Sequence, residues 1–157
     1  EIAMDSLFID PQKFLSEHLT EDVAENPGTR PGIVGHVHLQ VGDVDTARSF
    51  YVDTLGFETT AGTHPGALFA AAGGYHHHVA MNSWNSRGAG PRATSLGLAD
   101  VAVTLPARED LDALTARLKA AGLQFADEGR SVSVEDPWGT PVTFSLPGTG
   151  TEELLSR

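Results

Sequence analysis

Histidine is the residue type that offers this chain the most chemistry. Five of its seven histidines fall in two short runs, His36-Val-His38 and His76-His-His78. A neutral imidazole can bind a divalent metal ion, and its ordinary pKa lets it exchange a proton near neutral pH. The chain has no cysteine, which excludes thiolate catalysis, disulfides and cysteine-ligated zinc or iron–sulfur sites. Any metal ion would therefore bind histidine, carboxylate and water.

The spacing of the two runs predicts how the rings would face on extended strands. Side chains alternate across a strand, so His36 and His38 share one face with Gln40. By the same alternation we expect His77 to face away from His76 and His78, packed or exposed on the opposite side. All three could then not meet one ion. For His36 and His38, a hydrogen-bonded histidine without metal is as good an explanation as a metal ligand.

The elements that would position these histidines occur twice along the chain. Apolar periodicity in the first half predicts a strand over 33–41, a helix over 44–55 and strands over 57–60, 67–72 and 76–84. The second half repeats this order with a strand over 98–105, a helix over 111–121 and strands over 123–126, 131–134 and 141–146. Val37 and Val101 lie 64 residues apart, and Gly74 and Gly139 lie 65 apart. The halves therefore match at both ends, as expected of an internal repeat.

Each half has the order β-α-β-β-β, which predicts the fold class α+β. We expect two paired β-α-β-β-β modules that form a curled mixed sheet around a cleft. The domain is expected over residues 32–148, with repeats at about 33–84 and 97–147. Residues 1–31 contain Pro and Gly clusters typical of a linker, with a short helix over Pro11–Leu19, and 149–157 is expected to be a tail.

Length and charge exclude several classes of protein. The chain has 157 residues, enough for one domain with one core. Its 10 basic and 21 acidic residues give a net charge of −11, which argues against binding nucleic acid or an anionic membrane surface. No apolar run approaches the ~20 residues of a membrane span, so we expect a cytoplasmic protein. Because the first residue is Glu1 and not Met, we expect a processed chain or a piece of a longer one.

Three segments resemble the vicinal-oxygen-chelate superfamily, which includes glyoxalase I, extradiol dioxygenases and bleomycin-resistance proteins. They run from Gly35 to Asp43, from Ser49 to Phe57 (Ser-Phe-Tyr-Val-Asp-Thr-Leu-Gly-Phe), and over Asp136-Pro-Trp-Gly-Thr140. The segment Gly73–Trp84 is similar to catechol 2,3-dioxygenase-like proteins that carry two paired domains. The resemblance implies that this chain is a C-terminal half whose N-terminal half is missing or is a separate chain.

The resemblance also implies which residues form the site. Metal ligands of the superfamily lie on the first and last strands of each module, and the matching positions are His36, His78, Asp100 and Thr143. The implied metal ligands are His36, His78 and Asp100. The implied substrate-binding residues are His38, His76, Asn82 and Thr143. Two positions depart from the dioxygenase pattern, since Asp100 replaces a histidine and Thr143 replaces a glutamate.

The function implied is that of an extradiol-type dioxygenase, or the C-terminal half of one, acting on a small aromatic diol. Its cofactor would be a divalent metal, Fe(II) or Mn(II) first, and two imidazoles with one carboxylate suit such an ion. A glyoxalase-type lyase would use the same kind of site. The alternatives are a metal-free protein that binds a small molecule, or a structural half-domain. The expected partners are a small aromatic ligand and either the missing N-terminal half or a second copy of the chain.

Overall fold

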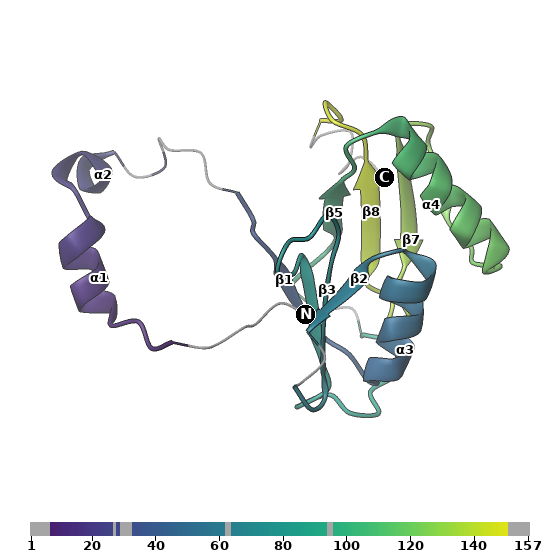
Figure 1. Cartoon of the computed structure of the whole chain (residues 1–157), viewed down its shortest axis with the longest axis horizontal. Helices are drawn as coiled ribbons and strands as arrows, with labels where there is room; N and C mark the ends of the chain where they lie inside the picture. The colour runs from purple at the N-terminus through teal and green to yellow at the C-terminus, as the bar shows by residue number, and fades with distance from the viewer. Residues whose placement is uncertain (1–6, 27, 29–32, 62–63, 94–95, 151–157) are drawn as a thin grey trace.

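A computed structural model describes residues 7–26, 28, 33–61, 64–93 and 96–150 of the chain. In this part the strands form two open four-stranded sheets (Figure 1). The first sheet has the strand order β1-β4-β3-β2. Its strands are β1 (Val37–Gln40), β2 (Glu58–Ala61), β3 (Ala67–Ala71) and β4 (Val79–Asn82). The β1–β4 pair is parallel, and the pairs β2–β3 and β3–β4 are antiparallel.

The second sheet repeats this topology in the order β5-β8-β7-β6. Its strands are β5 (Val101–Thr104), β6 (Ala126–Asp127), β7 (Ser131–Glu135) and β8 (Pro141–Ser145). The β5–β8 pair is again parallel and the other two pairs are antiparallel. The predicted α+β class with two β-α-β-β-β modules is therefore confirmed. The strands are hydrogen-bonded as two sheets, one to each module.

The two modules differ in the helix that follows their first strand. In the first module α3 (Val44–Arg48) continues directly into the π-helix η1 (Ser49–Thr54). The Asp43 carboxylate caps the start of α3 by accepting a 2.7 Å hydrogen bond from the Thr46 amide. Gly56, at φ +91°, follows the last turn of η1. In the second module α4 (Arg108–Ala120) is a regular α-helix whose buried stripe is Leu111, Leu114 and Leu118.

One hydrophobic core joins the two modules, because buried side chains from both sheets and both helices contact one another. Polar contacts add to the junction. The Tyr51 hydroxyl donates a buried 3.0 Å hydrogen bond to the Asp136 carboxylate, 85 residues away in the chain. The Arg117 guanidinium on α4 donates to the carbonyls of Thr54 and Leu55 at 3.1 and 2.8 Å. The modules therefore pack as one body.

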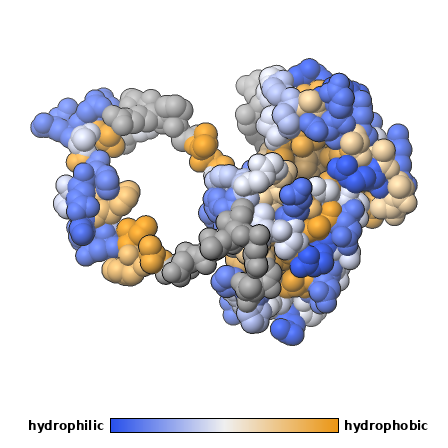
Figure 2. All heavy atoms as spheres, in the orientation of Figure 1, coloured by the Kyte–Doolittle hydropathy of each residue, from blue (hydrophilic) through white to orange (hydrophobic). Residues whose placement is uncertain are grey.

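The segment before the first module contains α1 (Pro11–His18) and α2 (Glu21–Glu25) and buries no residue in either helix. Figure 1 shows it apart from the two sheets, and Figure 2 shows apolar side chains gathered on one side of α1. The second helix was not predicted from the sequence. Parts of the predicted linker (27 and 29–32) and of the predicted tail (151–157) lie outside the described residues. Within the described residues, no helix is long and apolar enough to cross a bilayer.

Candidate metal centre

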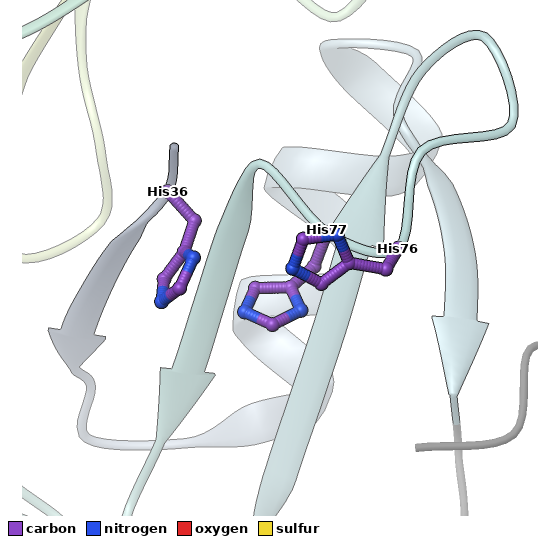
Figure 3. Close-up of side chains that lie close together, drawn as sticks. All are labelled: His36, His76 and His77. Carbon is purple, nitrogen blue, oxygen red and sulfur yellow. The ribbon is translucent and has the colours of Figure 1, made fainter. Parts of the chain in front are cut away.

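Three histidines of the first module bring their ring nitrogens together. One ligand atom from each of His36, His76 and His77 lies within 4.8 Å of the others. The ring centroids are 4.3 Å apart for His36 and His77, and 4.4 Å apart for His76 and His77. Figure 3 shows His36 at the start of β1, with the rings of His76 and His77 gathered on the chain that leads into β4. We call these three side chains the histidine triad.

The chain before β4 explains why neighbouring histidines can reach the same point. Regular pairing begins only at His78, whose amide donates to the Ala70 carbonyl and whose carbonyl accepts from the Val37 amide. His76 and His77 precede this pairing, so strand alternation does not apply to them. The Thr60 hydroxyl holds the His76 carbonyl at 2.5 Å. The prediction that His77 faces away from His76 is wrong for this reason.

His77 is a buried, neutral imidazole without a hydrogen-bond partner. Its side chain is 7% exposed, and neither ring nitrogen bonds to any of the described residues. Burial, and after it the charges of the neighbouring histidines, His36 first, together lower the pKa of His77 to about 4. At neutral pH the ring therefore keeps a free lone pair. An unpaired buried nitrogen is costly, and a bound cation would satisfy it.

The triad is open to solvent on one side, because His36 is exposed and His76 is half-buried. Imidazole nitrogen is a suitable ligand for iron, zinc, copper and nickel. Three protein ligands leave coordination positions for water or substrate, which is the arrangement of catalytic rather than structural sites. The residues present thus fit a divalent metal ion of the transition series.

Two residues predicted to bind metal with His36 lie outside the triad. His78 accepts a 3.3 Å hydrogen bond from the Ala72 amide at Nδ1, and its ring packs 4.7 Å from that of Tyr75. Burial, and then the charge of His76, lower the pKa of His78. Asp100 is half-buried directly before β5, and its Oδ1 atom is buried with no hydrogen-bond partner among the described residues.

The predicted substrate-binding residues fall on both sheets. His38 is exposed on β1, and its ring centroid lies 5.1 Å from that of His36. Partial burial of the ring, and then the charge of His36, lower the pKa of His38. Asn82 is half-buried on β4, opposite Gln40 in register. Thr143 is buried on β8 in the second sheet, where its hydroxyl lies 2.8 Å from that of Ser133. His76 belongs to the triad itself.

Sequence reasoning assigned no role to two residues of this region. One is His77, and the other is Phe69 of β3, whose ring contacts those of His77, His38 and His64 with centroid distances of 5.2, 6.3 and 5.4 Å. The glycine pair before the histidine run was the sequence signal that could have indicated irregular backbone around His77. Gly73 and Gly74 both adopt positive φ, +65° and +76°, which marks irregular backbone and not a strand.

A cavity of about 790 Å³ lies where the two modules meet. Its walls come from the starts of β1 and β4, from all of β5, and from one side of α4. His36 and His78 are among the lining residues, so the cavity borders the triad through His36. The triad is therefore next to a space large enough for a small organic ligand.

Known proteins match this chain over the two modules. A family model described as "Glyoxalase/Bleomycin resistance protein/Dioxygenase superfamily" matches residues 33–144. The catechol-2,3-dioxygenase of Bacillus subtilis (strain 168) is 44% identical over 118 residues, which are 73% of this chain and 41% of that protein. The chain thus spans less than half the length of this relative.

Solved structures share the fold at lower identity. A glyoxylase/bleomycin resistance protein/dioxygenase domain from Frankia sp. EAN1pec aligns with a TM-score of 0.61 and 21% identity, covering 80% of this chain and 98% of that one. A lactoylglutathione lyase from Agrobacterium tumefaciens aligns with a TM-score of 0.56 and 18% identity, covering 82% and 100%. At such identities the likeness concerns the fold alone.

Proposed function

We propose that this chain, which belongs to the glyoxalase/bleomycin resistance protein/dioxygenase superfamily, binds one divalent metal ion through His36, His76 and His77 and presents it to a small aromatic diol. The reaction proposed is extradiol-type ring cleavage by dioxygen. The relative from Bacillus subtilis, a catechol-2,3-dioxygenase, supports the choice of substrate and reaction. Fe(II) is the metal we expect first, with Mn(II) second.

The observation that carries the proposal is the state of His77. Its pKa is about 4, and among the described residues neither of its buried ring nitrogens has a hydrogen-bond partner. Its neighbours His36 and His76 offer further lone pairs within 4.8 Å. A metal ion would join all three rings and remove the cost of burying an unpaired polar group.

A bound metal ion would act as a Lewis acid and as a template for two neighbouring oxygens. The side chains of this chain would do the rest. Phe69 gives the site a flat apolar wall against which an aromatic ring can pack edge-on. His38 stands beside His36 and can accept a hydrogen bond from a diol hydroxyl through its neutral ring. Asn82 and Gln40, opposite each other farther along the strands, can bind a polar group of the substrate.

The sequence also supports two alternatives to this proposal, one with a different set of metal ligands and one without catalysis in this chain. The first keeps His36 as a ligand but adds His78 and Asp100, and the orphaned Oδ1 atom of Asp100 favours it. The second assigns catalysis to another part of a longer protein and leaves this chain as a ligand-binding or structural half. The chain's coverage of 41% of its relative and the buried Thr143 in place of a glutamate favour that view.

The proposal is tested by metal content and oxygen uptake of protein that carries no histidine tag. Anaerobic titration with Fe(II) and with Mn(II) should show one equivalent bound, and catechol should then drive oxygen consumption. His36→Ala should lose both metal binding and oxygen consumption, because it removes a proposed metal ligand. His36 is exposed, so this substitution should leave the fold intact. His18→Ala, on α1, is the matched control and should lose neither.

Two outcomes would count against the proposal in different ways. A wild-type chain that binds no divalent metal would exclude the metal centre altogether. A chain that binds one equivalent but consumes no oxygen with catechol would keep the metal centre and overturn the proposed reaction, in favour of the alternative that this chain is a ligand-binding or structural half.

A further inference from the structure

The cavity between the modules is larger than a single six-membered ring requires. Its volume, about 790 Å³, falls in the range of pockets that enclose drug-sized ligands. The first module lines it with Phe57 and Val79, and the second with Val101, Leu114 and Phe144. Most of the lining side chains are apolar, with Asp110 and Arg117 of α4 as the charged ones, so the cavity favours a ligand with a largely apolar body.

One end of the cavity reaches the candidate metal centre and carries a fixed hydrogen-bond donor. His36 belongs both to the histidine triad and to the cavity wall, and His78 lines the cavity beside it. Because Nδ1 of His78 accepts from the Ala72 amide, the neutral ring carries its proton on Nε2. His78 thus offers an N–H group to an oxygen atom of a ligand.

A second polar feature runs along the cavity wall. Within the described residues β5 pairs only with β8, so its other edge is unpaired. The Leu105 amide bonds to the Ser145 carbonyl of β8, and by alternation the backbone groups of Ala102 and Thr104 face the free edge. Both residues line the cavity. A ligand with an apolar body and a few oxygen atoms suits these walls.

We propose that the inter-module cavity binds the apolar substituent of a substituted aromatic diol, whose oxygen-bearing end lies at His36 and His78. The inference rests on the proposed function for the diol end only. An unsubstituted diol would leave most of the cavity filled with water. An alkyl or aryl substituent would bury apolar surface there, and each added methylene group should tighten binding about fourfold.

The test compares catechol with 4-butylcatechol by isothermal titration of the full chain, with and without Mn(II). The wild-type protein should bind 4-butylcatechol roughly 250-fold more tightly than catechol, since four carbon atoms enter the cavity at about fourfold each. Ala113→Trp should abolish this gain and leave catechol binding unchanged. Ala113 is an exposed residue of α4 that lines the cavity, so a larger side chain fills the space without disturbing the core.

The matched control is Ala116→Trp. Ala116 is also exposed on α4 but is not among the described residues that line this cavity. It should keep the full gain from the butyl group. Equal affinity for the two diols in the wild type would overturn the inference even where catechol itself is bound and cleaved.

The two proposals fail separately. If the butyl group tightens binding in the metal-free protein while Mn(II) adds nothing, the cavity stands and the proposed metal function falls. Light scattering on the same samples tests whether a second copy of the chain occupies the cavity instead. If Ala113→Trp changes the oligomeric state and not the affinity for 4-butylcatechol, the groove is an interface between two copies and the inference is overturned.

Discussion

The two modules share one topology and differ in the connection that leads into their last strand. In the first module residues 72–78 join β3 to β4 and carry His76 and His77, which present their rings to His36. In the second module residues 136–140 join β7 to β8. There the buried Asp136 carboxylate accepts hydrogen bonds from the amides of Trp138 and Thr140, at 2.9 and 2.7 Å, and from the Tyr51 hydroxyl.

The same place in the repeat therefore serves different purposes. In the part of the chain that the structure describes, the buried His77 ring of the first connection has no hydrogen-bond partner, whereas the buried Asp136 carboxylate of the second accepts from three donors. His36 and Asp100 correspond, since each directly precedes the first strand of its module. In the strand register Val79 matches Val142, so His78 corresponds to Pro141, and Thr143 corresponds to Ala80. Duplication supplied the scaffold twice, and the candidate chemistry gathers in the first module while the second ties the modules together.

The largest effect on stability should come from removing Asp136. Asp136→Ala deletes the acceptor of three hydrogen bonds and leaves buried donors unpaired, so the free energy of unfolding should fall by roughly 3–5 kcal/mol. Urea denaturation measures the loss. Asp53→Ala, an exposed acidic residue of η1, is the control and should change stability by less than about 0.5 kcal/mol. Similar losses in the two variants would show that the second connection does not join the modules.

The pH dependence of stability should reveal His77. Its pKa in the folded metal-free protein is about 4, below the ordinary value of 6.5, so the unfolded chain binds more protons between these values. Stability should be highest above pH 6.5 and fall by as much as about 3 kcal/mol as the pH decreases toward 4. His77→Phe should flatten this slope in denaturation curves recorded at several pH values. An unchanged slope would mean that His77 is not buried as a neutral ring.

Tyr51 offers a smaller test of the junction. Burial, followed by the negative charge of Asp136, raises the pKa of Tyr51 far above its ordinary value, so the hydroxyl stays protonated and donates. Tyr51→Phe should lower the free energy of unfolding by about 1–2 kcal/mol, because Asp136 keeps its two amide donors. Thermal unfolding measures this, and metal stoichiometry should be unchanged. A loss as large as that of Asp136→Ala would contradict the sharing of the carboxylate among three donors.

The smallest effect is expected at His38, which lies beside the triad without belonging to it. His38→Asn should change the affinity for Mn(II) by less than about threefold, since ligand loss costs far more than this. Binding of a diol to the metal-loaded protein should weaken instead, because His38 is placed to accept a hydrogen bond from a hydroxyl group of the diol. Titration of metal and of catechol separates the two effects. Loss of metal in this variant would make His38 a ligand.

Much of the fold could be predicted from the sequence because it depends on periodicity. The matched offsets and the apolar stripe of α4 identified two β-α-β-β-β modules, and the spacing over 44–55 placed the helical segment. The change from α3 to the π-helix η1 has no signal in apolar spacing. Within the site, the apolar pattern predicted a strand over 33–41 that includes His36, whereas β1 begins at Val37 and His36 directly precedes it. The orientation of His77 could not be predicted, because it depends on where the backbone of β4 first pairs with its neighbours, and contacts between distant segments decide that.

The choice of metal ligands beside His36 lies between His76 with His77, as proposed, and His78 with Asp100. The most direct measurement is an anaerobic Fe(II) titration of tag-free wild-type, His76→Ala and His78→Ala proteins, side by side. Both histidines are half-buried neighbours in one connection, so the two variants are matched. We expect one tight equivalent of Fe(II) in the wild type and in His78→Ala, and none in His76→Ala. Retention of metal by His76→Ala together with its loss in His78→Ala would contradict this expectation.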